Sequence, residues 1–308
     1  RTNNVTGFTE RSLRNFQGSG EHYFPNVLGA KFDWTVALAR TQQEEPDLRF
    51  VSFYRNQLFA GGDTNNVIRT AGFAFPSRIF RDLVEDKSSV VGNLEIPVQV
   101  NGRTANLKMG GSYSYTDRAF RENFYFIDPD QGIFTDLGGN VEEFFGLEYR
   151  GVVDTTGSAS FPRFQFGNIV TDNTQPRNNY DGTTEITGGY FMVELPVTDR
   201  LKFVGGARLE RAVIDIVSFD TTTTIQNGEE VRIGEGTLDN TDLLPSLNLI
   251  YGLGDNSNVR LAYTRTIARP NQREIAPFAS FEFIGDFQKL GNVNLERTLI
   301  TNYDARWE

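Results

Sequence analysis

Residues able to do covalent or metal chemistry are scarce in this sequence. It has no cysteine and one histidine, His22, which excludes thiol catalysis, iron–sulfur clusters, cysteine-bound zinc and sites built from several histidines. The adjacent pairs Glu142–Glu143 and Glu229–Glu230 cannot act as catalytic dyads on a strand, because neighbouring strand residues face opposite ways. We therefore expect no enzyme, no catalytic residue and no cofactor.

Short acidic clusters are the remaining candidates for metal ligands. The stretch Asp239–Asp242 and the pair Asp172–Asn173 could hold calcium on a loop, but neither has the spacing of an EF-hand. Solvated loop polarity explains both clusters better, so we expect no metal site.

Aromatic residues with arginines nearby form the other group that could do chemistry. They gather in the stretches 119–184 and 269–298, and the first of these is too aromatic to be disordered. Aromatic faces with guanidinium groups could receive a sugar, an aromatic chelate or an anionic complex. The alternative is that these aromatics only pack a loop against the rest of the protein. The candidate ligand-binding residues are Phe124, Tyr125, Phe126, Arg150, Arg163, Arg177, Tyr180, Phe281 and Phe283.

Charge and composition narrow the possible partners. The chain has 308 residues, and its 30 basic and 40 acidic residues give 30 − 40 = −10 formal charges. This balance argues against nucleic acid as a partner, because nucleic-acid binders carry a basic stripe. No apolar run approaches the roughly 18 residues that a membrane helix needs. The polar opening Arg1–Asn4 is not a signal peptide, so we expect a processed piece or a fragment of a longer protein.

Alternation of apolar and polar residues is the strongest structural signal, and it indicates strands. Mean hydropathy is low, at −0.39, although 13% of the residues are aromatic. Strands that face lipid on one side only reconcile these two values. In one example, Phe32, Trp34, Val36 and Leu38 alternate with Asp33, Thr35, Ala37 and Ala39.

The expected strands are joined alternately by short and long connections. This alternation is typical of outer-membrane barrels, which have short periplasmic turns and long outer loops. The nine expected strands are 26–40, 48–58, 88–101, 104–118, 185–196, 201–217, 243–253, 258–268 and 299–308, and the expected long loops are 59–87, 119–184, 218–242 and 269–298.

A soluble β-sandwich is the structural alternative. It would hide apolar residues such as Phe32, Trp34, Leu107 and Leu261 between two stacked sheets. Two features favour a membrane barrel instead. Aromatic residues cluster near strand ends, as interface girdles do, and the opposite faces mix charged residues with glycine and alanine, which suits a wet lumen.

Several stretches resemble the barrel of TonB-dependent outer-membrane receptors. The resemblance covers most of residues 26–308, and the loops match least. The order of the motifs is its most specific aspect. These motifs lie in Arg78–Asp86, Leu107–Tyr113, Asp117–Glu122, Tyr190–Glu210, Leu244–Leu249, Val259–Pro270, Gly291–Glu296 and Asn302–Glu308.

Family-motif residues are expected to build the barrel rather than to touch ligand. Pro245 would begin a strand, where a missing amide costs little, and Arg269–Pro270 would end one because proline cannot extend the ladder. The full structural set is Arg208, Glu210, Pro245, Tyr263, Arg269, Pro270, Asn292 and Trp307.

The resemblance implies an all-β fold, a transmembrane antiparallel up-and-down β-barrel. Family barrels commonly have about 22 strands and carry an N-terminal plug in the lumen. Residues 1–308 contain neither a plug nor a segment able to engage TonB. We therefore expect one partial barrel domain that belongs to a longer receptor.

The resemblance also implies a function in the bacterial outer membrane. A receptor of this kind imports a scarce nutrient, such as a ferric siderophore, haem, cobalamin or an oligosaccharide, with energy supplied by TonB. The implied partners are TonB, membrane lipid, the nutrient and a surface lipoprotein. Two other functions remain open: a structural or interaction subunit of an outer-membrane complex, and a soluble carbohydrate-binding β-protein.

Overall fold

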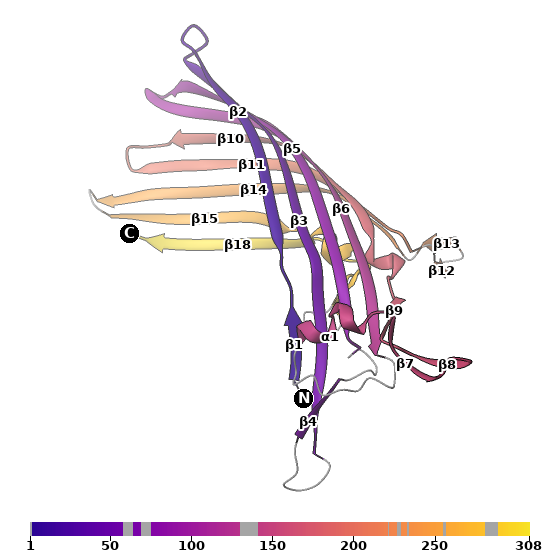
Figure 1. The fold of residues 1–308 in the computed structure, drawn as a ribbon. Coiled ribbons are helices and arrows are strands. Elements are labelled where there is room, and N and C mark those ends of the chain that lie inside the picture. The colour runs from indigo at the N-terminus through magenta and orange to yellow at the C-terminus, as the bar shows by residue number, and fades with distance from the viewer. Residues whose placement is uncertain are drawn as a thin grey trace.

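A single large antiparallel sheet dominates the computed structural model (Figure 1). No helix among the residues that the structure describes is long and apolar enough to cross a membrane. The structure describes residues 2–57, 64–68, 75–129, 141–220, 222–226, 229–232, 234–254, 257–280 and 289–308.

The main path of this sheet has the strand order β1-β3-β5-β6-β10-β11-β14-β15-β18, and β2, β4 and β9 pair beside it. In the described parts of the long connections there are three small hairpins and four short helical segments. The bounds in the main sheet are β1 Thr2–Thr6, β2 Glu10–Phe24, β3 Ala30–Gln57, β4 Thr64–Ile68, β5 Ser77–Val100, β6 Arg103–Pro129, β9 Asn168–Asp172, β10 Tyr180–Pro196, β11 Leu201–Ser218, β14 Glu235–Gly254, β15 Ser257–Ala268 and β18 Thr298–Trp307. The others are α1 Val141–Phe144, η2 Leu147–Tyr149, β7 Val152–Ser158, β8 Phe161–Phe166, η3 Pro176–Asn178, β12 Thr223–Gln226, β13 Glu229–Arg232, α2 Gln272–Ile275, β16 Ala279–Ser280 and β17 Lys289–Leu290.

The two expected strands 26–40 and 48–58 are one strand, so the expected turn at 41–47 is wrong. Strand β3 runs through this stretch and keeps its pairing with β5 on one side. The register shifts between Glu45 and Leu48, around Pro46, which has no amide to donate to the ladder. Pro46 therefore lies in a β-bulge, and the strand continues on both sides of it.

The sequence analysis missed strands β1 and β2. Strand β1 pairs with residues 49–53 of β3, and β2 pairs with residues 30–44 of the same strand. In β2, alternation is weak because glycine, serine and charged residues occupy much of Glu10–Phe24. The tight connection that precedes β3 is therefore 25–29.

The expected long loops are shorter than predicted, because strands continue past the apolar stripe. Strands β5 and β6 have 24 and 27 residues, and their outer parts pair with each other from Ser77↔Phe126 onward. At about 3.3 Å per residue such strands exceed an apolar band of about 25 Å. The stretches 77–87 and 119–129 are thus strand, although the first is rich in charged residues and the second in aromatic residues without strict alternation.

Strand register divides the sheet into two faces, which we call the apolar face and the polar face. Directly paired residues share a face, so Trp34, Gly92 and Gly111 lie together on the apolar face. The expected apolar stripes all fall there, and side chains such as Leu38 and Leu261 are 55% and 50% exposed. The polar face carries Asp33, Asn93, Lys108, Arg208 and their neighbours in register.

This arrangement contradicts the soluble β-sandwich. Phe32, Trp34, Leu107 and Leu261 share one face of one sheet, and no second sheet covers them among the described residues. The tight turns lie at one end of the sheet and the long connections at the other (Figure 1). We call the latter the outer end.

Candidate ligand-binding site

A pocket of about 250 Å³ opens on the polar face at the outer end of the sheet. It is built by five strands and by the segment 271–278, which includes α2. Its lining residues are Arg11, Gln43, Glu45, Arg81, Leu83, Arg118, Phe120, Tyr180, Arg273 and Phe278.

The register of the sheet brings these residues together. Arg11 pairs with Gln43 across β2 and β3, and Leu83, Phe120 and Tyr180 form one rung across β5, β6 and β10. Side chains of one rung point to the same face and lie about 5 Å apart at Cβ. The pocket is therefore a direct consequence of strand pairing.

Three aromatic rings form one wall of the pocket. The Phe120 ring stacks on Tyr180 at 5.5 Å between centroids, and Phe278 meets Phe120 edge-on at 4.9 Å. Behind them lies a buried cluster that includes Ile216 and Ile275. The rings are thus held from behind and present a fixed surface to the pocket.

Segment 271–278 docks firmly on the polar face. Asn271 and Glu274 form a capping box that starts α2, each side chain accepting a backbone amide of the other residue. The Gln272 side chain donates to the Thr184 hydroxyl at 3.0 Å. This segment supplies Arg273 and Phe278 to the pocket, and the Arg273 guanidinium lies 5.6 Å from the centre of the Phe278 ring.

Two of the pocket arginines are held by carboxylates. Arg81 donates to Glu122 at 2.7 Å and to Glu45 at 3.3 Å. Arg118 donates through Nε to Glu85 at 2.7 Å. Glu122 is only 3% exposed and also accepts from Asn178 at 2.5 Å, which ties η3 to the sheet.

Arginines outnumber carboxylates among the residues that line the pocket. Arg11 donates to the neutral amide oxygen of Gln43 at 2.8 Å. The lining residues include four arginines, Arg11, Arg81, Arg118 and Arg273, and one carboxylate, Glu45. Several N–H groups therefore face a space that also offers aromatic surface, an arrangement suited to an anionic or aromatic ligand.

Burial keeps the Tyr180 hydroxyl protonated at neutral pH. Burial raises the pKa of Tyr180, and the nearby Arg118 only partly opposes this effect. The phenol therefore stays protonated in the pH range in which a receptor works.

A second charged group lies on the opposite side of the sheet, just past the bulge in β3. Asp47 accepts from Arg49 at 2.7 Å and from Arg78 at 2.8 Å. Burial raises the pKa of Asp47, but the hydrogen bonds and charges of the two arginines outweigh it, so the pKa is lowered. Asp47 thus stays ionised and fastens the outer parts of β3 and β5.

The structure gathers only part of the predicted ligand set. Tyr180 lines the pocket, whereas Phe124 packs with Phe50 and Ile79 in a separate cluster. Tyr125 lies on the apolar side, next to a cluster around Phe144. All three residues of Phe124–Phe126 are in β6, so their expected place in a loop is wrong.

The predicted arginines do not line this pocket. Arg150 and Arg163 are exposed in the connection between β6 and β10. Arg177 lies in η3, and its Nε is buried without a hydrogen-bond partner among the described residues. Phe281 and Phe283 fall outside the described residues, so their role stays a prediction.

Sequence reasoning missed the arginines that do line the pocket. Arg81 lies in a stretch that was assigned to a loop, whereas Arg118 is the last residue of the expected strand 104–118. Arg11 lies in a stretch that was assigned to no element. Arg273 comes from a loop that was noticed only for its phenylalanines. The usable signal was the persistence of alternation through Arg78–Leu83 and Arg118–Phe124.

Family-motif residues form a chain of ion pairs on the polar face. Arg208 donates to Ser112 at 2.8 Å and to Glu210 at 2.6 Å, and Arg269 meets the same Glu210 at 2.6 Å. Arg297 donates to Asp242 at 2.7 Å. These contacts fasten neighbouring strands and the end of the 269–297 connection, as expected for residues that build the wall.

Other motif residues are also structural, with one correction. Pro245 is in the middle of β14, not at its start. Its missing amide is tolerated because pairing with β15 begins only at Ser246. Pro270 follows the end of β15, and the Asn292 amide donates to the Glu274 carbonyl at 2.7 Å. The Trp307 indole donates to the Ser257 hydroxyl at 2.8 Å. The ring centroids of Tyr263 and Tyr303 lie 5.2 Å apart.

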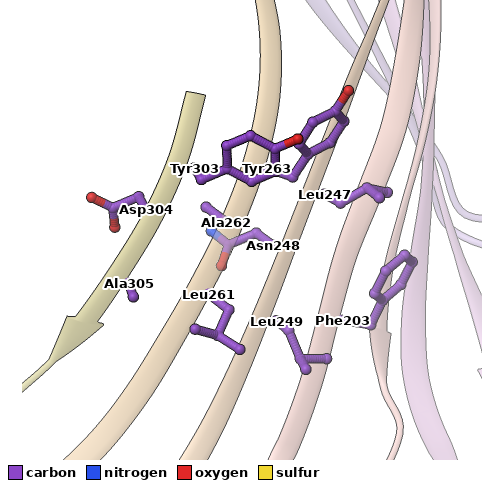
Figure 2. A pocket seen from close by; sticks show the side chains of 10 residues that line it. All are labelled: Phe203, Leu247, Asn248, Leu249, Leu261, Ala262, Tyr263, Tyr303, Asp304 and Ala305. Carbon is purple, nitrogen blue, oxygen red and sulfur yellow. The ribbon is translucent and has the colours of Figure 1, made fainter. Parts of the chain in front are cut away.

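A larger hollow of about 560 Å³ is a poorer candidate for a polar ligand (Figure 2). Its walls are mainly side chains of the apolar face, among them Phe203, Leu249, Leu261, Tyr263 and Tyr303. No cluster of metal-binding residues occurs in the described part of the chain.

Comparisons with known proteins agree with this architecture. Residues 3–308 match the family model described as TonB dependent receptor-like, beta-barrel. Comparison with curated proteins found no match. The Pseudomonas aeruginosa receptor FpvA, bound to a heterologous pyoverdine, is 16% identical with a TM-score of 0.52 over 96% of this chain. The ferripyoverdine receptor of the same organism, with ferripyoverdine bound, is 15% identical with a TM-score of 0.50 over 84%. The chain spans 30% and 27% of these two structures, and at such identity the likeness shows the fold alone.

Proposed function

Because this chain belongs to the family of TonB-dependent receptor β-barrels, we propose that it forms part of the wall of a receptor that imports a scarce nutrient. Receptors of this family are outer-membrane proteins of Gram-negative bacteria. The apolar face of the sheet meets lipid, and the polar face lines the lumen. The energy for import would come from TonB, through parts of the receptor outside residues 1–308.

The polar face is the observation that carries this proposal. The polar face bears a series of ion pairs, from Lys108–Glu95 to Arg297–Asp242. The same strands expose apolar side chains on their opposite face. A wall of this kind borders water or a polar domain rather than a hydrophobic core. It suits a barrel through which a polar solute passes.

An anionic ferric siderophore is the ligand class that we propose. The pocket joins arginine side chains to aromatic surface and lies at the outer end of the lumen, where a ligand arrives from outside. The two structures of similar fold hold ferric pyoverdines, which is consistent with this class. Cobalamin and neutral oligosaccharides, which carry no carboxylate or catecholate groups, fit the guanidinium groups of the lining less well. A surface lipoprotein partner stays a prediction.

Uptake of radioactive iron tests the proposal. The intact receptor that contains this chain is expressed in cells lacking other siderophore receptors, with and without TonB, and challenged with a panel of ferric siderophores. We expect at least one anionic chelate to be taken up only when TonB is present. Uptake that is absent for the whole panel, or equal without TonB, would contradict import.

The pocket is tested separately by Arg11→Gln. Arg11 bonds a neutral amide, so its removal leaves no carboxylate unpaired. We expect the concentration for half-maximal uptake to rise roughly fivefold, in line with one exposed charge contact. The matched control is Arg103→Gln at the opposite end of the sheet, where Arg103 pairs with Asp199. TonB-dependent uptake that is unchanged in Arg11→Gln would keep the import function and remove the pocket assignment.

A further inference from the structure

A hollow of about 370 Å³ opens on the apolar face, at the upper edge of the apolar band. It lies over β2, β3, β5 and β6, which run side by side (Figure 1). Its walls combine charged residues, including Arg14, Arg40 and Asp86, with Phe16, Leu38 and Tyr115. Because this face meets lipid, the hollow is separate from the lumenal pocket.

One rung of the sheet places two arginines directly opposite each other. Arg14 pairs with Arg40, Arg40 pairs on its other side with Asp86, and Asp86 pairs with Asp117, so the rung holds two arginines and two aspartates. Like charges in directly opposed positions repel. Arg40 reaches Asp86 at 3.6 Å, whereas Arg14 has no carboxylate partner among the described residues. An anion placed between the two guanidinium groups would relieve this repulsion.

The height of this rung matches the head-group layer. Arg40 is ten residues along β3 from Ala30, where the strand leaves its tight turn. With about 3.3 Å per residue and the tilt of barrel strands, this distance is about 25 Å, the height of an apolar band. The rung next to it on the band side is Phe16, Leu38, Ser88 and Tyr115.

The same rung provides a groove for a hydrocarbon chain. Ser88 is small and stands between Leu38 and Tyr115. Phe16 and Leu38 are 74% and 55% exposed, so they offer apolar surface to a molecule that lies against the wall. A head group at the arginines can therefore extend a chain along the apolar face.

We propose that this hollow binds a phosphate-bearing lipid of the outer leaflet. The phosphate lies between Arg14 and Arg40, whose planar guanidinium groups match its oxygens, and an acyl chain lies over Leu38 and Ser88. This inference rests on the location in the outer membrane and not on nutrient import. The competing explanation is a divalent cation that joins the lipid to the acidic rung of Glu10, Glu44 and Asp82, which lies further from the band on the same face.

Binding of purified lipid A to the detergent-solubilised intact receptor tests the proposal. The diphosphorylated form and its dephosphorylated counterpart are titrated against the wild type and against Arg14→Gln/Arg40→Gln. We expect the double variant to bind the diphosphorylated lipid roughly 25-fold more weakly, because two exposed charge contacts of roughly fivefold each multiply. The dephosphorylated lipid should show a similar weakening with the wild type. Arg14→Lys/Arg40→Lys should retain most of the affinity, because the positive charges remain.

Arg211→Gln is the matched control. Arg211 is also an exposed arginine on the apolar face at the edge of the band, but it pairs with Asp239 at 2.7 Å and faces Thr187 and Thr241 in its rung. Retention of slow gel mobility without boiling shows that each variant is a folded barrel. Three results would overturn the proposal: equal weakening by Arg211→Gln, unchanged binding by the double glutamine variant, or equal binding of both lipid forms. Loss of binding in EDTA with no effect of the arginine changes would assign the lipid to a cation bridge instead.

Discussion

Replacement of Glu122 by glutamine should loosen η3 from the outer end of the sheet. Glu122 is 3% exposed and joins Arg81 at 2.7 Å to Asn178 at 2.5 Å. Hydrogen bonds to a charged partner stabilise by about 1.5–3 kcal/mol each, and breaking a buried ion pair costs about 3–5 kcal/mol. Arg81 keeps Glu45 at 3.3 Å, and glutamine still accepts one hydrogen bond. We therefore expect a loss near the lower end, about 2 kcal/mol.

Hydrogen exchange measures this loss where it occurs. A loss of about 2 kcal/mol corresponds to roughly 30-fold faster exchange of amides that open locally. Mass spectrometry of peptides that cover 173–181 should show the increase in Glu122→Gln, while peptides from β15 stay unchanged. Arg103→Gln, which removes an exposed pair with Asp199, should leave both sets of peptides unchanged.

A double-mutant cycle with Arg81→Gln tests the reasoning itself. If Glu122 acts through Arg81, the effects of the two changes are not additive, and the coupling is about 1–2 kcal/mol. Additive effects within about 0.5 kcal/mol would refute a contribution of the Arg81 ion pair to holding Glu122 in place for its hydrogen bond with Asn178.

Three further changes have definite expected outcomes. Acidification should open the outer parts of β3 and β5. The lowered pKa of Asp47 gives stability that is present above the ordinary value of 3.8 and is lost as the pH falls through the folded-state pKa. Hydrogen exchange of peptides around the bulge should show a weaker acid dependence in Asp47→Asn. Gly206→Ala should reduce the yield of folded barrel, because an added Cβ would lie 2.8 Å from the Cα of Met192. Gly111→Ala is the control and should not reduce the yield, because the nearest heavy atom to its added Cβ is 3.7 Å away. Equal yields would contradict the close approach of the strands at Gly206. Ile275→Ala should cost about 2–4 kcal/mol of local stability, because the side chain is only 1% exposed in the cluster behind the pocket. The backbone amides of segment 271–278 should then exchange hydrogen faster. Unchanged exchange would show that other contacts hold the segment.

Sequence reasoning was strongest where the signal is local. Alternation along Phe32–Leu38 assigned each residue to a face, because successive strand side chains point to opposite sides whatever the partner strand is. It failed where a strand continues without an apolar stripe. Arg78–Leu83 was assigned to a loop, although its backbone is satisfied by pairing with β3 and β6 and its charges by ion pairs. The polar strand β2 was missed for the same reason.

The sequence by itself therefore determined the all-β class, the apolar and polar faces and the family, since these depend on residue types at a period of two and on motif order. Only the tertiary structure decided where strands end, which residues share a rung and where the pocket lies. The pocket joins Arg11 to Phe278, and the pairing of β2, β3, β5, β6 and β10 brings them together. Register between distant strands is set by the sum of many cross-strand contacts, so no single stretch of sequence records it.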